Sequence, residues 1–226
     1  MNLLVLGKGK MGSLIIELAQ QRGHQVRAHD EFDNIKGSML TPERLRDVDV
    51  VIDFTIPDAV VENTEAVARA GKNMVVGTTG WYQHMDRLRQ LVEQSGTGFL
   101  YGANFSVGVN LFYEILRSGA PALQHGYHGR ITETHHIHKK DAPSGTAANM
   151  RDVIEQVSGK KLEITSIREG EVFGTHVLQL ESEDDTITLT HDAKSRRGLA
   201  EGALRAAEWL RGRRGFYDFK DIFHQV

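Results

Sequence analysis

The chain has 226 residues and no cysteine, so it can build one large or two smaller cores, while disulfides, thiolate catalysis and cysteine-based zinc sites are excluded. Its net charge of −3, with 40% hydrophobic and 25% charged residues, gives no support for a general attraction to nucleic acid or membrane. No apolar run approaches the roughly 18 residues that span a bilayer, and the short apolar N-terminus has no basic region, so we expect a cytoplasmic protein.

The first 30 residues have the order of a dinucleotide-binding fingerprint. Residues 2–6 are an apolar run typical of a buried parallel strand, and residues 25–29 predict a second strand that ends at Asp30. Apolar residues between them recur at helical spacing. The G-x-G-x-x-G turn that joins the first strand to this helix reads Gly7-Lys8-Gly9-Lys10-Met11-Gly12.

Each glycine of this turn has an expected task. Gly7 would permit the tight turn, Gly9 the close approach of a pyrophosphate, and Gly12 the close packing of helix on strand, while Asp30 would accept hydrogen bonds from the adenine-ribose hydroxyls. An ordinary strand-to-helix turn is the alternative. Because a carboxylate repels a 2′-phosphate, Asp30 favours NADH over NADPH; nearby lysines could offset that repulsion (Lys8, Lys10 and Lys36).

The alternation of strands and helices continues to about residue 100. Strands are predicted at 48–54, 73–76 and 97–100, with helices at 60–70 and 82–95. This order predicts an α/β fold with a Rossmann-type, doubly wound parallel sheet, whose ligands lie beyond the carboxyl ends of the strands. The small-residue loops that follow strands, at 54–55, 77–80 and 102–105, would therefore rim one crevice with room for a nicotinamide ring. Ordinary turn chemistry competes for any single loop.

The pattern changes after a helix predicted at 106–118. Strand-like segments at 129–139, 162–168, 171–181 and 186–191 predict a smaller α+β domain with a mixed or antiparallel sheet and one open face. A helix at 198–212 and an apolar tail are expected to return to the first domain. We therefore predict a dinucleotide-binding domain from residues 1–104 and 200–226, and a substrate-binding and oligomerisation domain from 105–199.

The stretch 132–147, TETHHIHKKDAPSGTA, concentrates the reactive side chains. If residues 129–139 are a strand, His135 and Lys139 share one face, where a histidine can give up a proton and a lysine can attract a carboxylate. The helix that follows would open at Ser144, Gly145 and Thr146, whose N–H groups and hydroxyls can hold an anion. This combination indicates a site that binds and protonates a small anionic molecule.

Other interpretations of this stretch fit less well. A zinc site from His135, His136 and His138 lacks H-E-x-x-H spacing and is split over two strand faces, so we expect no metal. Ser144 as a hydrolase nucleophile would need a G-x-S-x-G elbow. A purely structural role, in which Ser144 only caps the helix and the histidines lie on the surface, is the better interpretation for His138 and Lys140.

The same stretch resembles a known family. Residues 133–146, ETHHIHKKDAPSGT, match the E-x-H-H-x-x-K-x-D-A-P-S-G-T signature of the 4-hydroxy-tetrahydrodipicolinate reductases, also called dihydrodipicolinate reductases. Residues 53–55, 77–80, 103–110 and 191–196 are similar to further motifs of that family, in the same order. The glycine turn is one residue shorter than the common family form, the chain is short between residues 157 and 166, and Glu169 replaces a common glycine.

The resemblance implies an oxidoreductase of lysine and diaminopimelate biosynthesis. It would pass a hydride from NADH or NADPH to a cyclic, doubly carboxylated imine-enamine and give tetrahydrodipicolinate. His135 would donate the proton with Lys139 as its catalytic partner, and family members usually form homotetramers through the substrate domain. Substrate contacts would be His136, Lys139, Ser144, Gly145 and Thr146; cofactor contacts would be Gly7 to Gly12, Asp30, Gly77, Thr78, Thr79, Gly102, Ala103, Asn104 and Phe105.

Two other functions stay open at this point. One is an NAD(P)-dependent reductase of another small dicarboxylate or imine. The other is a catalytically silent, NAD-binding regulator, against which the intact pair of His135 and Lys139 argues.

Overall fold

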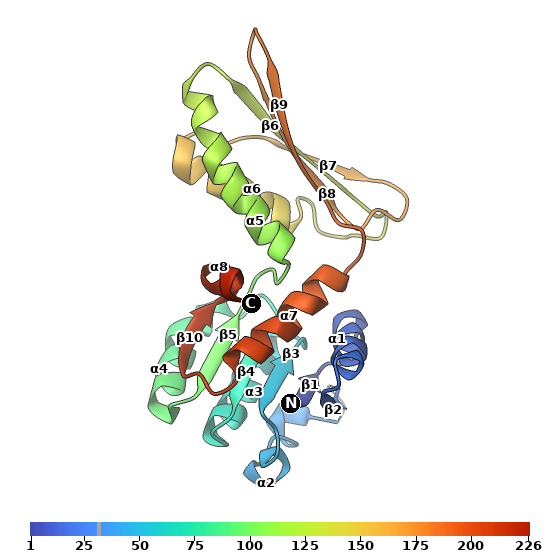
Figure 1. Ribbon diagram of the computed structural model, residues 1–226, viewed down its shortest axis with the longest axis vertical. Helices are drawn as coiled ribbons and strands as arrows, with labels where there is room; N and C mark the ends of the chain where they lie inside the picture. Colours follow the sequence, from blue (N-terminus) through green and yellow to red (C-terminus); the bar gives the residue numbers. More distant parts are fainter. Residues whose placement is uncertain (31–32) are drawn as a thin grey trace. The chain divides into compact units, whose positions relative to one another are not determined.

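The computed structural model describes residues 1–30 and 33–226, and the chain divides into two compact units (Figure 1). Unit 1 is Met1–Val107 with Arg197–Val226, and unit 2 is Gly108–Arg196. The domain limits predicted from the sequence differ by three residues at each junction, 104 against 107 and 200 against 197. No helix among the described residues is long and apolar enough to cross a membrane.

Unit 1 is built on a six-stranded parallel sheet with the order β10-β5-β4-β3-β1-β2, which confirms the predicted Rossmann-type architecture. Its central strands are largely apolar, as expected for strands covered on both faces, whereas the edge strands at 25–29 and 215–218 are mixed. The strands are β1 Asn2–Leu6, β2 Gln25–His29, β3 Val50–Asp53, β4 Asn73–Val76, β5 Gly98–Tyr101 and β10 Gly215–Asp218. The helices are α1 Lys10–Gln21, α2 Pro42–Leu45, α3 Pro57–Arg69, α4 Met85–Ser95, α7 Arg197–Leu210 and α8 Phe219–Ile222, with short 3₁₀ turns at Ile35–Gly37, Tyr82–His84 and Phe223–Gln225.

Two hydrophobic cores lie on opposite faces of this sheet. Leu3 and Val5 of β1 pack with α1 and α7, whereas Leu4 and Leu6 of the same strand belong to the core with α3 and α4. Alternate residues of one strand thus serve two helical layers, which is the doubly wound arrangement. The C-terminal tail joins this unit, because β10 pairs in parallel with β5 and Phe219 is fully buried. The prediction that the tail returns to the first domain is confirmed, although the strand β10 was not predicted.

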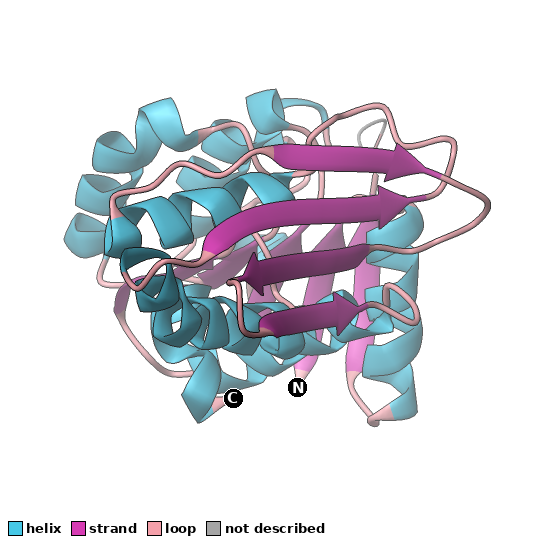
Figure 2. Ribbon diagram, turned by 90° about the horizontal axis from the view of Figure 1, so that it is seen from above, coloured by secondary structure: helices cyan, strands magenta, loops and turns pink. Residues whose placement is uncertain are grey.

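Unit 2 contains a four-stranded mixed sheet with the order β7-β6-β8-β9. Its strands are β6 His128–His135, β7 Ile164–Arg168, β8 Thr175–Glu181 and β9 Thr186–Asp192; its helices are α5 Val107–Gly119 and α6 Gly145–Ser158, with a 3₁₀ turn at Ala120–Gln124. Only the pair β6 and β7 is parallel. One face packs on α5 and α6 around Ile131, Leu178 and Met150. In Figure 2 the other face is turned to the reader, with no described helix in front of it.

One predicted strand is too long, and the error matters for the site. The sequence predicted a strand over 129–139, but β6 ends at His135. The chain then turns, because the Lys139 N–H donates to the carbonyl of His136 (3.1 Å) and the Ile137 N–H to that of Gly170 (3.2 Å). The argument that strand alternation places His135 and Lys139 on one face is therefore wrong.

Candidate active site

The glycine turn after β1 is held by close packing at two of its three glycines. Gly7 has a φ of +89°, and a Cβ there would lie 2.4 Å from the carbonyl oxygen of Phe54. A Cβ on Gly12 would lie 1.8 Å from the Gly7 carbonyl oxygen, so helix α1 can approach the turn only with glycine at this position. A Cβ on Gly9 would meet nothing within 4 Å. The protein therefore requires Gly7 and Gly12 for its own packing and leaves space above Gly9.

Two open pockets of unit 1 meet at this turn, beyond the carboxyl ends of the first four strands. They lie where the sheet order reverses, between β1 and β3, which is the usual ligand position in such sheets. One is lined by Gly7, Lys8, Gly9, Asp30, Phe54, Thr55 and Ile56. The other is lined by Gly9, Lys10, Met11, Phe54, Thr55, Pro57, Gly77, Thr78 and Thr79. The structure thus brings the predicted loops 7–12, 54–55 and 77–79 together with Asp30.

A buried carboxylate ties two of these loops to each other. Asp53, at the end of β3, is fully buried and accepts hydrogen bonds from Thr55 N–H (2.9 Å), Asn63 Nδ2 (2.8 Å) and Thr78 Oγ1 (3.3 Å). Burial raises the pKa of Asp53, and these donors oppose that shift. Sequence reasoning gave Asp53 no role of its own, because the residue only closes an apolar run.

The loop 102–105 lines neither pocket among the described residues. Phe105 is 2% exposed and its ring lies 4.8 Å from that of Phe219, while the Asn104 Oδ1 accepts from the Ser106 N–H (2.9 Å). A Cβ on Gly102 would lie 3.0 Å from the Cβ of Phe219. These residues fix the loop against the core of unit 1, and their predicted cofactor contacts stay a prediction.

Charged residues of both signs surround the adenosine end of the predicted cofactor site. Lys8 Nζ lies 3.7 Å from Asp30 Oδ2 and 3.1 Å from Asp33 Oδ2. The hydrogen bond to Asp33 raises the pKa of the Lys8 ammonium, which is exposed. One lysine therefore faces two carboxylates here.

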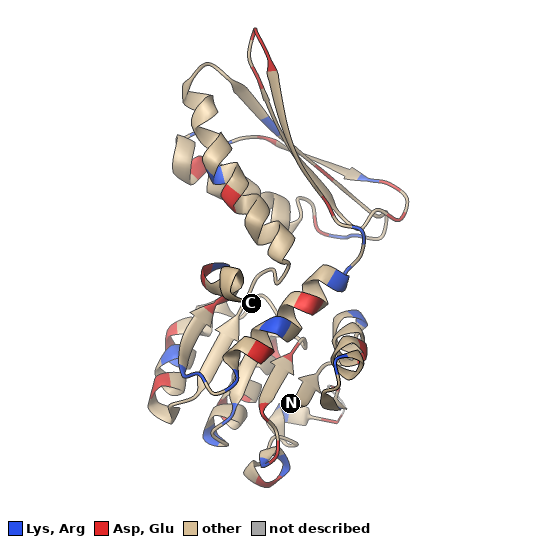
Figure 3. Ribbon diagram, viewed as in Figure 1, with Lys and Arg blue, Asp and Glu red and all other residues tan. Residues whose placement is uncertain are grey.

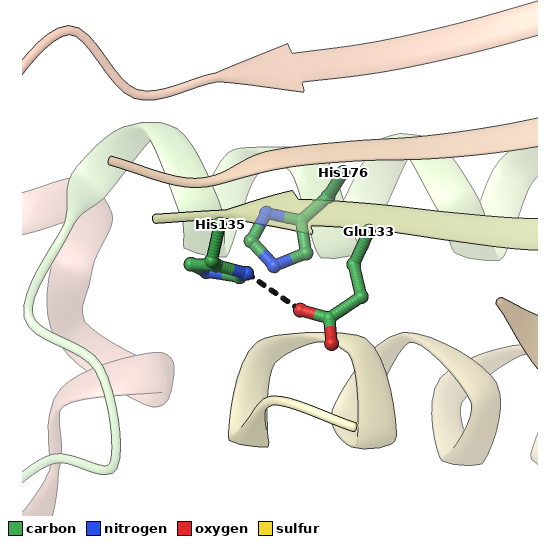
Figure 4. Close-up of side chains that lie close together, drawn as sticks. All are labelled: Glu133, His135 and His176. Carbon is green, nitrogen blue, oxygen red and sulfur yellow. Dashed lines mark ion pairs between the residues drawn. The ribbon is translucent and has the colours of Figure 1, made fainter. Parts of the chain in front are cut away.

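The reactive cluster of unit 2 is assembled by strand register. On β6, Glu133 and His135 point to the inner face; Glu133 is opposite Ser166 of β7 and His176 of β8, and His135 is opposite Arg168 of β7. Glu133 is fully buried, and His135 and His176 are 7% and 4% exposed. Figure 4 shows the carboxylate turned toward the His135 ring, with Oε2 at 2.6 Å from Nδ1. Neither of these two atoms has a hydrogen-bond partner of regular geometry.

The second oxygen of Glu133 ties the cluster to two further elements. Oε1 accepts from the Ser144 N–H (3.1 Å) and from Arg168 Nη2 (3.0 Å). Burial alone would raise the pKa of Glu133, but hydrogen bonds from Ser166, Ser144 and Arg168 lower it to about 2. Glu133 is therefore a carboxylate at neutral pH.

The two imidazoles of the cluster are neutral at neutral pH. Burial lowers the pKa of His135, and the Lys139 and Arg168 charges lower it further, against the opposing effect of Glu133. Burial, with the neighbouring His135, lowers the pKa of His176 to about 4. The rings of His135 and His176 lie edge to face with centroids 5.1 Å apart.

At the start of α6, Ser144 is buried, whereas Gly145 and Thr146 are accessible to solvent. Ser144 is 2% exposed; its hydroxyl caps the helix by accepting from the Ala147 N–H (3.2 Å) and contacts His176 Nε2 (3.3 Å). The capping role that the sequence analysis kept as an alternative is thus present, and the predicted substrate contact of Ser144 stays a prediction. Gly145 is exposed with nothing within 4 Å of a Cβ, and Thr146 is half-buried.

Two cations lie near the histidines of this stretch. Lys139 Nζ pairs with Asp141 Oδ1 at 2.8 Å, and its charge acts on His135 although the two do not share a strand face. Arg196 Nη2 lies 3.4 Å from His136 Nε2. His138 is exposed, as predicted, 3.9 Å from Glu171. Arg196 is a cation of this site that the sequence analysis did not assign.

One group among the described residues could hold a metal ion: Glu133, His135 and His176, whose ligand atoms lie within 4.8 Å of one another. It shares only His135 with the three histidines considered from the sequence. Arg168 already binds the same carboxylate, and the Lys139 charge reaches both histidines. These positive charges oppose the binding of a cation, and the hydrogen bond from Arg168 helps to keep Glu133 ionised.

Three residues of the cluster were missed from the sequence. Glu133 lies two positions before His135 on a predicted strand, so strand alternation could have found it. Arg168 and His176 enter only through the pairing of β6 with β7 and β8. No local pattern indicates that pairing.

Comparison with known proteins finds matches to one family along nearly the whole chain. Residues 1–105 match the family described as dihydrodipicolinate reductase, N-terminus, and residues 108–223 match dihydrodipicolinate reductase, C-terminus. A 4-hydroxy-tetrahydrodipicolinate reductase of Christiangramia forsetii is 36% identical, covering 100% of this chain and 99% of the relative. One from Natronomonas pharaonis is 39% identical, covering 98% and 99%.

Solved structures share the fold. A dipicolinate-bound dihydrodipicolinate reductase from Paenisporosarcina sp. TG-14 has a TM-score of 0.80 at 22% identity, over 98% of this chain and 99% of that one. An aspartate dehydrogenase from Thermotoga maritima reaches a TM-score of 0.51 at 14% identity, over 94% and 97%. Because both halves of the family match in order and full-length relatives exceed 30% identity, this chain belongs to the 4-hydroxy-tetrahydrodipicolinate reductase family.

Proposed function

We infer that this protein is an NAD(P)H-dependent oxidoreductase that reduces 4-hydroxy-tetrahydrodipicolinate to tetrahydrodipicolinate in lysine and diaminopimelate biosynthesis. The observation that carries this function is its family membership along nearly the whole chain. The buried Glu133–His135 pair, with two cations near the histidines of the same stretch, supports it, because reduction of a dicarboxylate needs both a proton donor and anion-binding groups.

The glycine turn fits a dinucleotide. The open space above Gly9 admits a pyrophosphate, and Asp30 lies on the same pocket for the adenine ribose. Gly77, Thr78 and Thr79 line the adjoining pocket, and we assign Gly102 to Phe105 to the nicotinamide side by family resemblance. When bound, the reduced nicotinamide supplies the hydride. We propose a slight preference for NADH, since a 2′-phosphate would meet the carboxylates of Asp30 and Asp33, which both lie near Lys8.

The substrate site that we propose is in unit 2. Hydride addition to one carbon of the conjugated imine leaves an electron-rich neighbouring carbon, and His135 gives that carbon a proton. Lys139 and His136 attract the substrate carboxylates, and the Gly145 and Thr146 N–H groups at the start of α6 donate to them. Ser144 contributes through its cap, which holds these N–H groups in place.

We also propose a homotetramer assembled through unit 2. Its sheet has one face packed on α5 and α6, and a second face that carries half-buried side chains such as Thr132, Val177 and Gln179. A sheet face of this kind, with no described helix over it, offers a surface for a second copy. The cytoplasmic location predicted from the sequence stays a prediction.

The test is oxidation of NADH and NADPH by the purified protein, with the substrate generated in place from pyruvate and aspartate semialdehyde by the preceding synthase. We expect rapid oxidation with both cofactors, somewhat faster at low NADH concentration than at equal NADPH. Oxidation with another cyclic imine but not with this substrate would indicate a different reductase. NADH binding without turnover of any imine would indicate a regulator.

A further inference from the structure

The buried carboxylate of Glu133 has a fixed position in unit 2. Its Oε1 accepts hydrogen bonds from the N–H of Ser144, the N-cap residue of α6, and from Nη2 of Arg168 on β7. Oε2 is left to face His135 Nδ1 at 2.6 Å. Among the described residues, this nitrogen has no hydrogen-bond partner that would compete with the carboxylate. A fixed anion on one side of a ring determines which ring nitrogen carries the proton of the neutral form.

The opposite nitrogen of the same ring faces the backbone of a glycine. Gly174, with a φ of +153°, lies beside His135, and a Cβ there would come within 2.9 Å of Nε2. The ring therefore has its Nδ1 toward a buried anion and its Nε2 toward a position without a side chain. In this geometry Nδ1 is the nitrogen that can be held by the carboxylate, and Nε2 is the nitrogen that can exchange a proton.

We propose that Glu133 is a positioning residue, which keeps the Nδ1 proton on His135 so that Nε2 is the nitrogen that takes up and delivers the catalytic proton. The proposal rests on the proposed function for the step itself. His135 takes a proton from solvent at Nε2, the N–H bond breaks as a C–H bond forms on the substrate carbon, and the ring returns to the neutral form with Nδ1–H. Glu133 stays ionised throughout.

The charges that face His135 decide when the ring is protonated. Glu133 on β6 favours the imidazolium, whereas Arg168 on β7, Lys139 in the following loop and burial beside His176 on β8 disfavour it. The two carboxylates of a bound substrate add negative charge and favour the imidazolium. The group that limits kcat/KM should therefore titrate at a lower pH than the group that limits kcat.

The first test compares Glu133→Gln, which removes the charge at nearly constant shape, with Glu163→Gln, the same change at an exposed glutamate of the same unit. Loss of an opposite charge at this distance should lower the pKa of His135 further and cut kcat/KM at neutral pH by roughly tenfold or more. Glu133→Asp, which keeps the charge, should restore part of the activity and of the pH profile. An unchanged profile in Glu133→Gln would overturn the proposal.

The second test does not need turnover. Nitrogen-15 NMR of the ligand-free protein, with His135 assigned through His135→Gln, reports which ring nitrogen is protonated above the titration of the ring. We expect the proton on Nδ1; a neutral ring protonated on Nε2 would overturn the proposal even if the enzyme is active. If the protein proves to be no reductase, this result still decides the position of the proton, and if Glu133→Gln does not fold, the wild-type spectrum decides alone.

Discussion

The glycine turn of unit 1 and the Glu133 cluster of unit 2 are two ways of building a site. The turn is formed by backbone atoms with no side chain at its glycines. A Cβ on Gly9 would meet nothing within 4 Å, and Gly12 lets the helix pack against the carbonyl of Gly7. The cluster consists of buried side chains from three strands and a helix start. The first arrangement leaves room for a ligand, and the second holds charges in fixed positions.

The difference has a consequence for mutation. In the turn, an added methyl group should harm binding or folding according to which glycine receives it. In the cluster, a removed charge or proton donor should harm catalysis with little effect on cofactor binding, because the cofactor loops belong to the other unit. Four tests, taken from the largest expected effect to the smallest, examine this contrast.

Replacing His135 by Gln should have the largest effect. Loss of a positioned proton donor typically costs roughly 10²- to 10⁴-fold in rate, so kcat should fall by that factor. The dissociation constant of NADH, measured by fluorescence titration, should stay unchanged. His138→Gln, at an exposed histidine three residues away, is the matched control and should keep wild-type rates. Equal losses in both variants would contradict the assignment.

Replacing Lys139 by Ala should weaken substrate binding. A charge-assisted hydrogen bond is worth about 1.5–3 kcal/mol, so the KM for the dicarboxylate should rise roughly 10- to 100-fold. Steady-state kinetics at saturating NADH measures the change. Lys140→Ala removes the same charge from a neighbouring exposed position and should leave the KM within a factor of about two. A larger change of the KM in Lys140→Ala than in Lys139→Ala would show that Lys140, and not Lys139, binds the substrate carboxylate.

The two glycines of the turn should separate folding from binding. Gly12→Ala places a methyl group 1.8 Å from a backbone oxygen, so the free energy of unfolding should fall by about 1–3 kcal/mol or more. Gly9→Ala has open space and an ordinary φ of −69°, so its stability should match the wild type while NADH binds more weakly. Chemical denaturation and NADH titration measure the two properties. Unchanged NADH affinity in Gly9→Ala would show that the pyrophosphate does not bind at this turn.

Asp30→Asn should give the smallest effect, because Asp30 shares an exposed charge network with Lys8 and Asp33. Removing one carboxylate should shift the ratio of NADPH to NADH efficiency in favour of NADPH by about fivefold, as expected for about 1 kcal/mol at an exposed site. Asp86→Asn, on the exposed side of α4, is the control and should keep the wild-type ratio. A shift toward NADH would contradict the placement of the ribose.

Acid stability gives a further test within the cluster. The pKa of His176 is about 4 in the folded protein against about 6.5 in an unfolded chain, so as the pH falls through that window the unfolded chain takes up a proton that the folded protein does not. The free energy of unfolding should therefore fall by up to about 3 kcal/mol between these values. His176→Gln should reduce this slope, and His125→Gln, at an exposed position, should not.

The fold and the glycine turn were largely predictable from the sequence, since their signals are local. The strands at 2–6, 25–29 and 73–76 have the predicted limits, and each is followed directly by a glycine or an aspartate. The start of α6 was also predictable, because Pro-Ser-Gly-Thr combines a capping serine with a break before the helix.

The chain by itself thus determined which elements form, where the glycine turn lies and which motif carries the histidines. It did not determine that β6 ends at His135, because the turn that follows is fixed by hydrogen bonds to residues of the β7–β8 loop. Only the tertiary structure decided that Glu133, Arg168 and His176 surround His135. Strand register between distant segments brings them together, and burial then sets their charges.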